Sequence, residues 1–253
     1  MMKFENKVMV ITGASSGVGR AAAVLAAKQG GKVYAMARRK ERLEELQKEV
    51  EEAGYAGVVI PLVCDVGKTE DVAKAFDRVK EENDKLDILI ANAGVMDKFE
   101  PVTHCDEDTF DRIYSTNVKG NFRVFKAAIP LMKGGGSIVA TSSIAGNRGG
   151  KAGVAYTMSK HAINGLVRNT AAMYGNDGIR CNAVAPAGIQ TEILQNLSDV
   201  DEKGMEVVQR GANVNKMLAM PEEIAEDILF LASDEASNIN GTILVSDGGL
   251  TGI

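Results

Sequence analysis

Short apolar runs alternate with helical patterns along the whole chain of 253 residues. The apolar runs predict β-strands at residues 7–12, 32–37, 58–63, 86–91, 137–142, 180–185 and 242–245. The stretches between them predict helices at residues 18–29, 39–53, 69–83, 107–132, 154–175 and 221–233. Strict alternation of helices with β-branched strands is typical of a parallel sheet that helices cover on both faces. We therefore predict an α/β fold with a doubly wound, seven-stranded parallel sheet.

Composition favours a single domain in a soluble protein. With 45% apolar and 25% charged residues, a chain of this length can build one large core, and no linker or repeat divides residues 1–253. No apolar run approaches the roughly twenty residues that cross a bilayer, and no signal peptide precedes the first strand. We therefore expect a cytoplasmic protein without a membrane partner. The net charge of −5 and the lack of a basic tract longer than RRK argue against a nucleic-acid partner.

The three cysteines, Cys64, Cys105 and Cys181, are odd in number and widely spaced. This pattern argues against a disulfide framework and against a zinc site. We expect three reduced thiols and no metal.

A glycine-rich turn follows the first predicted strand. The apolar run from Val8 to Ile11 ends in TGASSGVG, and an alanine-rich helical stretch begins at Arg20. Strand, glycine turn and helix is the order of a phosphate-binding site, because glycines let the backbone approach a pyrophosphate at the positive end of a helix. The residues expected to bind a dinucleotide here are Gly13, Ser15, Ser16, Gly17, Val18 and Gly19.

The same letters satisfy the pattern G-x-S-x-G, in which Ser15 would be the nucleophile of a serine hydrolase. Such an enzyme needs a histidine base, normally late in the chain. The two histidines, His104 and His161, precede or lie within predicted helices, and we expect both to be structural or solvated. An ordinary tight turn without a ligand is the other alternative.

Tyr156 and Lys160 stand four residues apart in YTMSK, within the predicted helix 154–175. This spacing places the phenol and the ammonium group on one helix face. A full charge at about 5 Å contributes roughly 3 kcal/mol, so we expect Lys160 to lower the pKa of Tyr156 by about two units from its usual value near 10. A phenol of lowered pKa suits acid/base catalysis, whereas such pairs on surface helices are often only solvated.

Together these motifs resemble the short-chain dehydrogenase/reductase family in its single-domain form. The resemblance covers essentially the whole chain and rests on TGASSGVG, CDV at 64–66, ANAG at 91–94, Asn117, Ser143, YTMSK, APAGIQT and the C-terminal SDGG. It implies a Rossmann fold, a nicotinamide cofactor, and hydride transfer between a secondary alcohol and a ketone. It also implies a homotetramer, or a homodimer, with helices 107–132 and 154–175 at the subunit contacts.

The resemblance implies a catalytic set of Asn117, Ser143, Tyr156 and Lys160. In that set Ser143 donates a hydrogen bond to the substrate oxygen, Tyr156 exchanges a proton with it, and Lys160 also binds the nicotinamide ribose. Asn117 bends the long helix and holds a water that links Lys160 to solvent. Ser142 competes for the serine role, but the thirteen-residue distance to Tyr156 favours Ser143.

Further cofactor contacts follow from the same resemblance. They are Asp65 and Val66 with the adenine, Asn92, Ala93 and Gly94 with its ribose, and Ile189 and Thr191 with the nicotinamide. One departure concerns the Pro-Gly pair that the family usually has after the sixth strand. This chain has Pro186 followed by Ala187, which puts the backbone path there in question, because a side chain stands where glycine would allow unusual dihedral angles.

The corner after the second predicted strand indicates the coenzyme. Folds that bind NAD place an acidic residue there to hold the ribose 2′-hydroxyl. Here the strand runs into Arg38 and Arg39, and no carboxylate is available. Two guanidinium groups suit a 2′-phosphate, although RRK could merely open a charged helix. We therefore predict that NADP(H) is preferred and that NAD(H) is possible.

Residues 192–220 form the one long irregular connection, which we predict to be a substrate lid rather than a plain surface insertion. Its methionines and nearby apolar residues indicate a lipophilic ketone or hydroxyl compound, such as a hydroxysteroid or bile acid. The expected substrate contacts are Met96, Ser143, Ile144 and Tyr156. A 3-oxoacyl thioester and a sugar alcohol remain alternatives, and a nucleotide sensor without catalysis is an alternative from another class.

Overall fold

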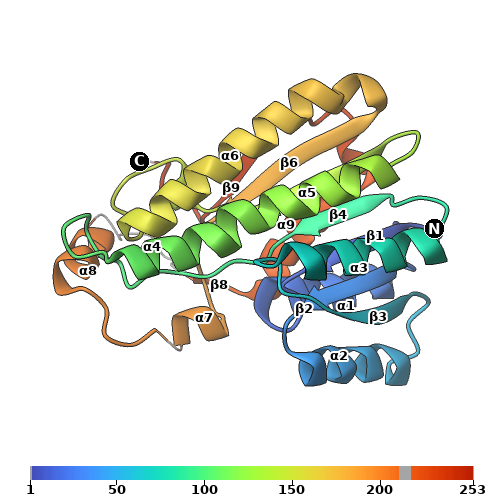
Figure 1. The fold of residues 1–253 in the computed structure, drawn as a ribbon, viewed down its shortest axis with the longest axis horizontal. Helices are drawn as coiled ribbons and strands as arrows, with labels where there is room; N and C mark the ends of the chain where they lie inside the picture. The colour runs from blue at the N-terminus through green and yellow to red at the C-terminus, as the bar shows by residue number, and fades with distance from the viewer. Residues whose placement is uncertain (1, 196, 211–217, 253) are drawn as a thin grey trace.

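A seven-stranded parallel sheet forms the centre of the molecule (Figure 1). The computed structural model describes residues 2–195, 197–210 and 218–252. The strands are β1 (Val8–Thr12), β2 (Lys32–Ala37), β3 (Val58–Val63), β4 (Ile88–Ala91), β5 (Gly136–Thr141), β6 (Ile179–Pro186) and β9 (Ile243–Ser246). They are arranged in the order β3-β2-β1-β4-β5-β6-β9, and all neighbours are parallel. The predicted α/β fold and its seven strands are confirmed.

Both faces of the central strands are buried, which explains their nearly continuous apolar runs. Successive side chains of a strand point to opposite faces. In β1, Met9 and Ile11 belong to the core on one face and Val10 to the core on the other, and all three are fully buried. Since neither face meets water, the central strands need apolar residues at every position.

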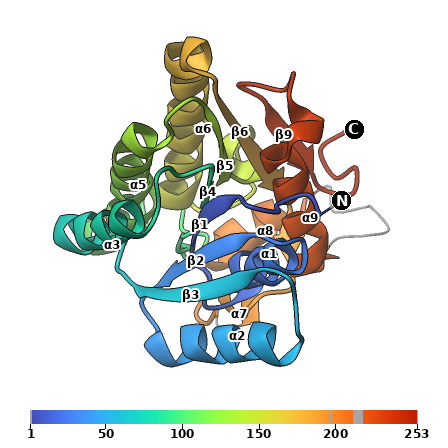
Figure 2. The same ribbon diagram turned by 90° about the vertical axis from the view of Figure 1, so that its right-hand side faces the viewer.

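Helices cover the two faces (Figure 2). One layer contains α1 (Gly17–Lys28), α2 (Lys40–Glu52) and α9 (Pro221–Ala232), and the other contains α3 (Thr69–Glu82), α5 (Asn121–Ala128) and α6 (Val154–Tyr174). Each presents an apolar stripe to the sheet. In α2, for example, Leu43, Leu46 and Val50 are buried while the charged residues between them face outward.

The predicted helix 107–132 is helical but not regular. It begins as α4 (Glu107–Ile113), becomes a π-helical segment, η1 (Tyr114–Gly120), and continues through α5 to a 3-10 turn, η2 (Ile129–Leu131). Asn117 lies in the π-helical segment with its side chain fully buried. Single π-helical stretches interrupt α-helices and often occur at functional sites. The family resemblance implied a bend of the helix at Asn117, and the π-helical segment was not predicted.

The connection after β6 contains short elements that the sequence did not predict. β7 (Gly188–Ile189) pairs with β8 (Leu218–Ala219), and the helices α7 (Glu192–Gln195) and α8 (Glu202–Gln209) lie between them. Residues 196 and 211–217 of the predicted lid lie outside the described residues. The start of α8 is bound to the loop after β4, since Asp201 N donates to Lys98 O at 2.8 Å.

Two further expectations concern the whole chain. The three cysteines are free thiols, as predicted. Among the helices of the described ranges, none combines the length and apolar character that crossing a bilayer requires.

Gly19 marks the closest approach of α1 to the end of β4. A Cβ atom added at Gly19 would lie 2.5 Å from Asn92 Nδ2 and 2.5 Å from Gly13 O. We expect Gly19→Ala to lower the free energy of unfolding by about 1–3 kcal/mol, because the methyl group overpacks this junction. Chemical denaturation measures the change.

Gly149→Ala is the matched control for this substitution. An added Cβ atom at Gly149 meets nothing within 4 Å, so its stability should stay within about 0.5 kcal/mol of the original. Equal losses in the two variants would contradict the close approach at Gly19.

Candidate active site

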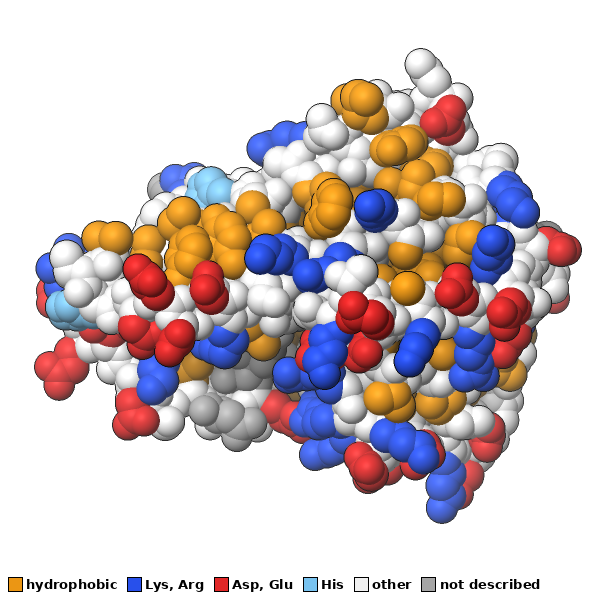
Figure 3. Space-filling view, in the orientation of Figure 1, with side chains coloured by type: hydrophobic (Ala, Val, Ile, Leu, Met, Phe, Trp, Pro, Cys, Tyr) orange, Lys and Arg blue, Asp and Glu red, His pale blue; other side chains and the backbone are white. Residues whose placement is uncertain are grey.

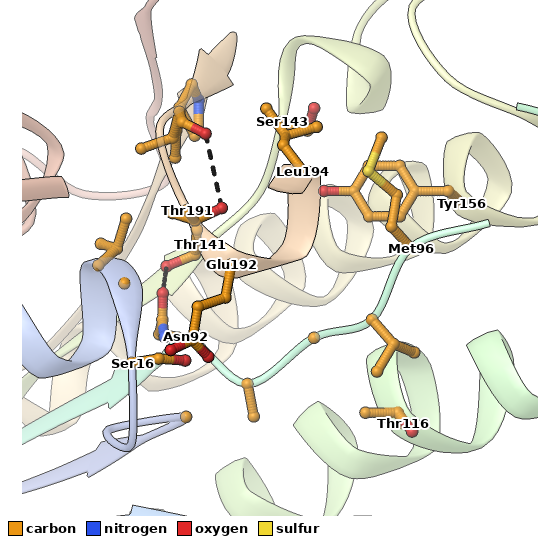
Figure 4. Close-up of a pocket in the computed structure, with 18 of the residues that line it drawn as sticks. Ser16, Asn92, Met96, Thr116, Thr141, Ser143, Tyr156, Thr191, Glu192 and Leu194 are labelled. Carbon is orange, nitrogen blue, oxygen red and sulfur yellow. Dashed lines mark hydrogen bonds between the residues drawn. The ribbon is translucent and has the colours of Figure 1, made fainter. Parts of the chain in front are cut away.

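A cleft opens at the carboxyl edge of the sheet, beside the neighbouring strands β1 and β4 (Figure 4). Chain connections leave these two strands in opposite directions, which is where doubly wound sheets bind ligands. The cleft encloses about 690 Å³ and extends from the glycine turn to Tyr156 and α7. Segments from most of the chain therefore meet in one space.

The glycine turn has the backbone expected of a phosphate cradle. Gly13 and Gly17 have φ angles of 68° and 55°, where side chains are disfavoured. An added Cβ atom would lie 2.9 Å from Asn92 Nδ2 at Gly13 and 3.0 Å from Thr191 Cγ2 at Gly17. The first turn of α1 contains no acidic residue, so the helix itself places no repelling charge against an anion at its N-terminus. These residues fit a dinucleotide pyrophosphate.

Asn92 joins three strands at the floor of the cleft. Thr12 Oγ1 accepts hydrogen bonds from Asn92 N and Ala93 N, both at 2.9 Å, and Asn92 Nδ2 donates to Thr12 O at 3.2 Å. Thr141 Oγ1 donates to Asn92 Oδ1 at 3.0 Å. The ends of β1, β4 and β5 are thus held together around this amide, as expected for a residue at the centre of the sheet.

The structure brings nearly all predicted cofactor residues into the cleft. Those that line it are Gly13, Ser15, Ser16, Gly17, Val18, Arg38, Arg39, Asp65, Val66, Asn92, Ala93, Gly94, Tyr156, Lys160, Ile189 and Thr191. Gly19 does not line the cleft and packs behind the turn. Thr191 Oγ1 donates to Ile189 O at 3.5 Å. Ala187 has no positive φ angle, so its side chain causes no left-handed strain.

The coenzyme corner differs from the expectation. Arg38 is exposed and lines the cleft, but Arg39 is ion-paired with Glu192, with Arg39 Nη1 2.9 Å from Glu192 Oε2. Glu192 lies in α7, 153 residues further along the chain. The prediction that no carboxylate is available at this corner is therefore wrong, because the fold supplies one from a distant segment.

Ser143 and Tyr156 face each other across the cleft (Figure 4). Ser143 Oγ accepts a hydrogen bond from Ala145 N at 3.1 Å, and its hydroxyl group also interacts with the Tyr156 phenol. Ser142 is buried, and its Oγ donates to Asn164 Oδ1 at 2.6 Å. The hydroxyl group of Ser142 is thus engaged in the protein interior, and Ser143 meets the tyrosine. Met96 and Ile144 also line this end of the cleft.

Lys160 and Asn117 lie behind Tyr156, and both side chains are buried. Lys160 Nζ donates to Thr141 O at 2.7 Å and lies 5.2 Å from the centre of the Tyr156 ring. Asn117 Oδ1 accepts from Val95 N at 2.8 Å, and its Nδ2 donates to Val95 O at 2.9 Å. The amide therefore fixes the loop after β4 beside the lysine.

The predicted lowering of the tyrosine pKa is wrong for this structure. Burial raises the pKa of Tyr156, the Ser143 hydroxyl group opposes this, and the Asp97 carboxylate raises it further. Burial also lowers the pKa of Lys160 to about 8, so its amine holds a proton less strongly than an exposed lysine does. An argument from distance alone omitted the desolvation of both groups.

Asp97 is a site residue that the sequence did not reveal. Its side chain is fully buried and accepts hydrogen bonds from the backbone N–H groups of Phe99, Gly153 and Tyr156, at 3.2, 3.1 and 2.8 Å. Gly153 and Tyr156 lie at the start of α6, so the carboxylate satisfies free N–H groups there. A single aspartate in a loop gives no sequence signal for this role.

The serine hydrolase alternative lacks a histidine base beside Ser15. Ser15 Oγ accepts a hydrogen bond from Arg39 Nη2 at 3.0 Å. His104 Nδ1 lies 2.6 Å from Asp201 Oδ2, and His161 Nδ1 lies 2.9 Å from Thr157 O. Neither of these two histidines lines the cleft that Ser15 faces.

Comparison with known proteins identifies the family. The family model described as Enoyl-(Acyl carrier protein) reductase matches residues 13–251. A 3beta-hydroxysteroid dehydrogenase from Mediterraneibacter gnavus is 38% identical over 99% of this chain and 97% of its own length. The chain belongs to the short-chain dehydrogenase/reductase family.

Two other short-chain dehydrogenases/reductases extend the comparison. A 3beta-hydroxysteroid dehydrogenase 2 from Eggerthella lenta is 36% identical, over 95% of this chain and 93% of its own. A structure of a protein assigned as an NAD(P)-dependent gluconate 5-dehydrogenase from Beutenbergia cavernae, with NADP at low occupancy, is 28% identical. It superposes with a TM-score of 0.87, over 100% of this chain and 99% of that one. The protein is thus a nicotinamide-dependent alcohol dehydrogenase or carbonyl reductase.

We expect Asp97→Ala to lower the free energy of unfolding by about 3 kcal/mol or more, because it leaves three backbone donors near the start of α6 without an acceptor. Asp97→Asn, which keeps one acceptor oxygen, should lose less. Urea denaturation measures both variants. A loss below about 1 kcal/mol for Asp97→Ala would contradict the assigned role.

Burial of Lys160 predicts that stability depends on pH. Its pKa of about 8 lies below the usual value near 10.4, so the unfolded chain binds more protons between these values and stability rises with pH. We expect the original protein to gain about 2 kcal/mol relative to Lys160→Met between pH 7 and 9.5. Denaturation of both proteins at each pH measures this difference, in which other titrating groups cancel. A constant difference across that range would show that Lys160 is not desolvated.

Proposed function

We propose that this enzyme interconverts a secondary alcohol and a ketone on a lipophilic substrate, a hydroxysteroid or bile acid, and prefers NADP(H) to NAD(H). The proposal depends most on one observation: Ser143 and Tyr156 face each other in the cleft that begins at the glycine turn. The two hydroxysteroid dehydrogenases among its relatives support the substrate class. Apolar side chains at this end of the cleft support it too; they are Val95, Met96, Phe99, Ile144, Leu194 and Leu197.

In this proposal the substrate oxygen lies between two hydroxyl groups. Ser143 donates a hydrogen bond that orients the oxygen, and Tyr156 gives it a proton in reduction and takes one in oxidation. A nicotinamide held by the residues of the cleft would supply the hydride in reduction and accept it in oxidation. Because burial raises the pKa of Tyr156, the phenol keeps its proton at neutral pH, which is the form that reduction requires. Lys160, one turn away, stabilises the phenolate that remains, and Asn117 supports the proton path to solvent.

The exposed guanidinium group of Arg38 supports the preference for NADP(H). It lines the cleft at the corner where a 2′-phosphate is expected, and a guanidinium group binds phosphate through paired hydrogen bonds. Residues Asp65, Val66, Ile189 and Thr191 complete the proposed coenzyme contacts.

The segment from α7 through α8 supports the proposed lid. Leu194, Leu197 and Val208 line the cleft from this segment. An added Cβ atom at Gly204 would overlap the backbone at Phe99, so α8 packs closely on the loop after β4. A lid that seals an apolar cleft excludes water from the reacting groups.

Exposed apolar side chains support a homotetramer, or a homodimer. Phe122 on α5 and Met158 and Met173 on α6 are all exposed, with Met173 at 67%. Figure 3 shows hydrophobic side chains gathered over these helices. Contiguous exposed apolar surface of this kind marks protein contacts.

Tyr156→Phe tests the catalytic proposal. We expect turnover of 3-hydroxysteroids and 3-oxosteroids to fall by a factor of about 10² to 10⁴, because the proton donor is lost, while binding of NADP(H) is retained. Tyr174→Phe, at the far end of α6, should leave turnover unchanged. The nicotinamide absorbance follows the reaction.

The same assay distinguishes the alternatives. A panel of steroids, 3-oxoacyl thioesters and sugar alcohols is tested with both NADP and NAD. Faster turnover of a 3-oxoacyl thioester or a sugar alcohol than of any steroid would contradict the proposed substrate class. Coenzyme binding without turnover of any carbonyl compound would favour a nucleotide sensor.

A further inference from the structure

Three separate segments meet at Arg39, near the coenzyme corner. Its Nη2 donates to Ser15 Oγ at 3.0 Å and to Ser16 Oγ at 2.8 Å in the glycine turn. Its Nη1 lies 2.9 Å from Glu192 Oε2 in α7. The other carboxylate oxygen of Glu192 lies 3.5 Å from Arg42 Nη2 in α2. Figure 4 shows Glu192 extending from α7 toward Ser16.

These contacts leave the arginines of the corner in different states. Glu192 pairs with both Arg39 and Arg42, so its single negative charge offsets only part of their positive charge. Arg39 holds the pKa of the Glu192 carboxyl group below its usual value. Arg38, in contrast, makes no hydrogen bond or ion pair within residues 2–195, 197–210 and 218–252. The corner therefore contains one available cation and two that share a single carboxylate.

We propose that Glu192 limits the preference for NADP(H) by competing with the 2′-phosphate of that coenzyme for Arg39 and Arg42. This inference rests on the coenzyme site of the proposed function. A phosphate group carries about −1.5 to −2 charge at pH 7 and binds a guanidinium group through the same in-plane N–H donors as a carboxylate does. It must displace Glu192 from Arg39 or bind beside a like charge. Glu192 thus weakens NADP(H) binding.

NAD(H) meets no such competition. Its ribose carries a neutral 2′-hydroxyl group, which can donate a hydrogen bond to a carboxylate, as in folds that place an acid at the end of the second strand. In this chain the acid comes from α7 instead of from the strand itself. Arg38 and Arg39 alone would favour NADP(H) over NAD(H). Glu192 therefore reduces the difference in affinity between the two coenzymes.

Glu192→Gln tests the inference, because it removes the charge and keeps the shape. We expect NADP⁺ to bind about 3- to 5-fold more tightly, the upper range for a partly exposed ion pair, and NAD⁺ to change by less than about twofold. Titration calorimetry without substrate measures both affinities independently of turnover. Glu202→Gln makes the same charge change on the exposed surface of α8 and should alter neither affinity.

A mutant cycle that combines Glu192→Gln with removal of both arginines separates competition from simple repulsion. In a protein with Arg39→Ala and Arg42→Ala, Glu192→Gln should no longer improve NADP⁺ binding, since the carboxylate has no guanidinium group to occupy. The inference is overturned if Glu192→Gln leaves NADP⁺ binding unchanged or weaker, if both coenzymes gain equally, or if the gain persists without the two arginines. Absence of turnover on every substrate, with the expected binding pattern intact, would overturn the proposed function alone.

Discussion

The hydrogen bonds that Thr12 Oγ1 accepts from Asn92 and Ala93 hold the carboxyl ends of β1 and β4 together. Because Gly13 and Gly19 have no side chains, the glycine turn and α1 can pack directly against this junction. The junction positions the N-terminus of α1 at one end of the cleft. Through Thr141 it also positions the end of β5, which leads to Ser143 at the other end. The two halves of the reaction site thus depend on one packed contact.

Burial dominates the electrostatics of the catalytic groups. Tyr156 and Lys160 have the expected helical spacing, yet the protein around them raises the pKa of the phenol and lowers that of the amine. Lys160 Nζ is directed to the Thr141 carbonyl group, which compensates part of its desolvation. Asp97 satisfies the backbone at the start of the same helix while adding a negative charge nearby. Asp97 therefore helps to fix the position of Tyr156 through the helix backbone, and its charge also affects the pKa of the phenol.

At the coenzyme corner, one residue that is distant in the sequence changes the charge that the local sequence predicts. Arg38 and Arg39 follow β2 without an adjacent acid, which by itself favours a phosphate ligand. Glu192, the first residue of α7 after β7, changes the charge of the corner. Because α7 also contributes Leu194 to the cleft, the same segment contacts both the coenzyme corner and the apolar end.

Local patterns in the sequence determined the strands, most helices, the glycine turn, and the shared face of Tyr156 and Lys160, because periodicity and turn chemistry act over a few residues. The π-helical segment at Asn117 and the short pairing of β7 with β8 were not predicted, since each depends on packing against distant segments. Only the tertiary structure decided the burial of Lys160, the position of Asp97 at the start of α6, and the pairing of Arg39 with Glu192. The reason is physical: desolvation and ion pairing depend on which groups the folded chain brings together, and here those groups lie up to 153 residues apart.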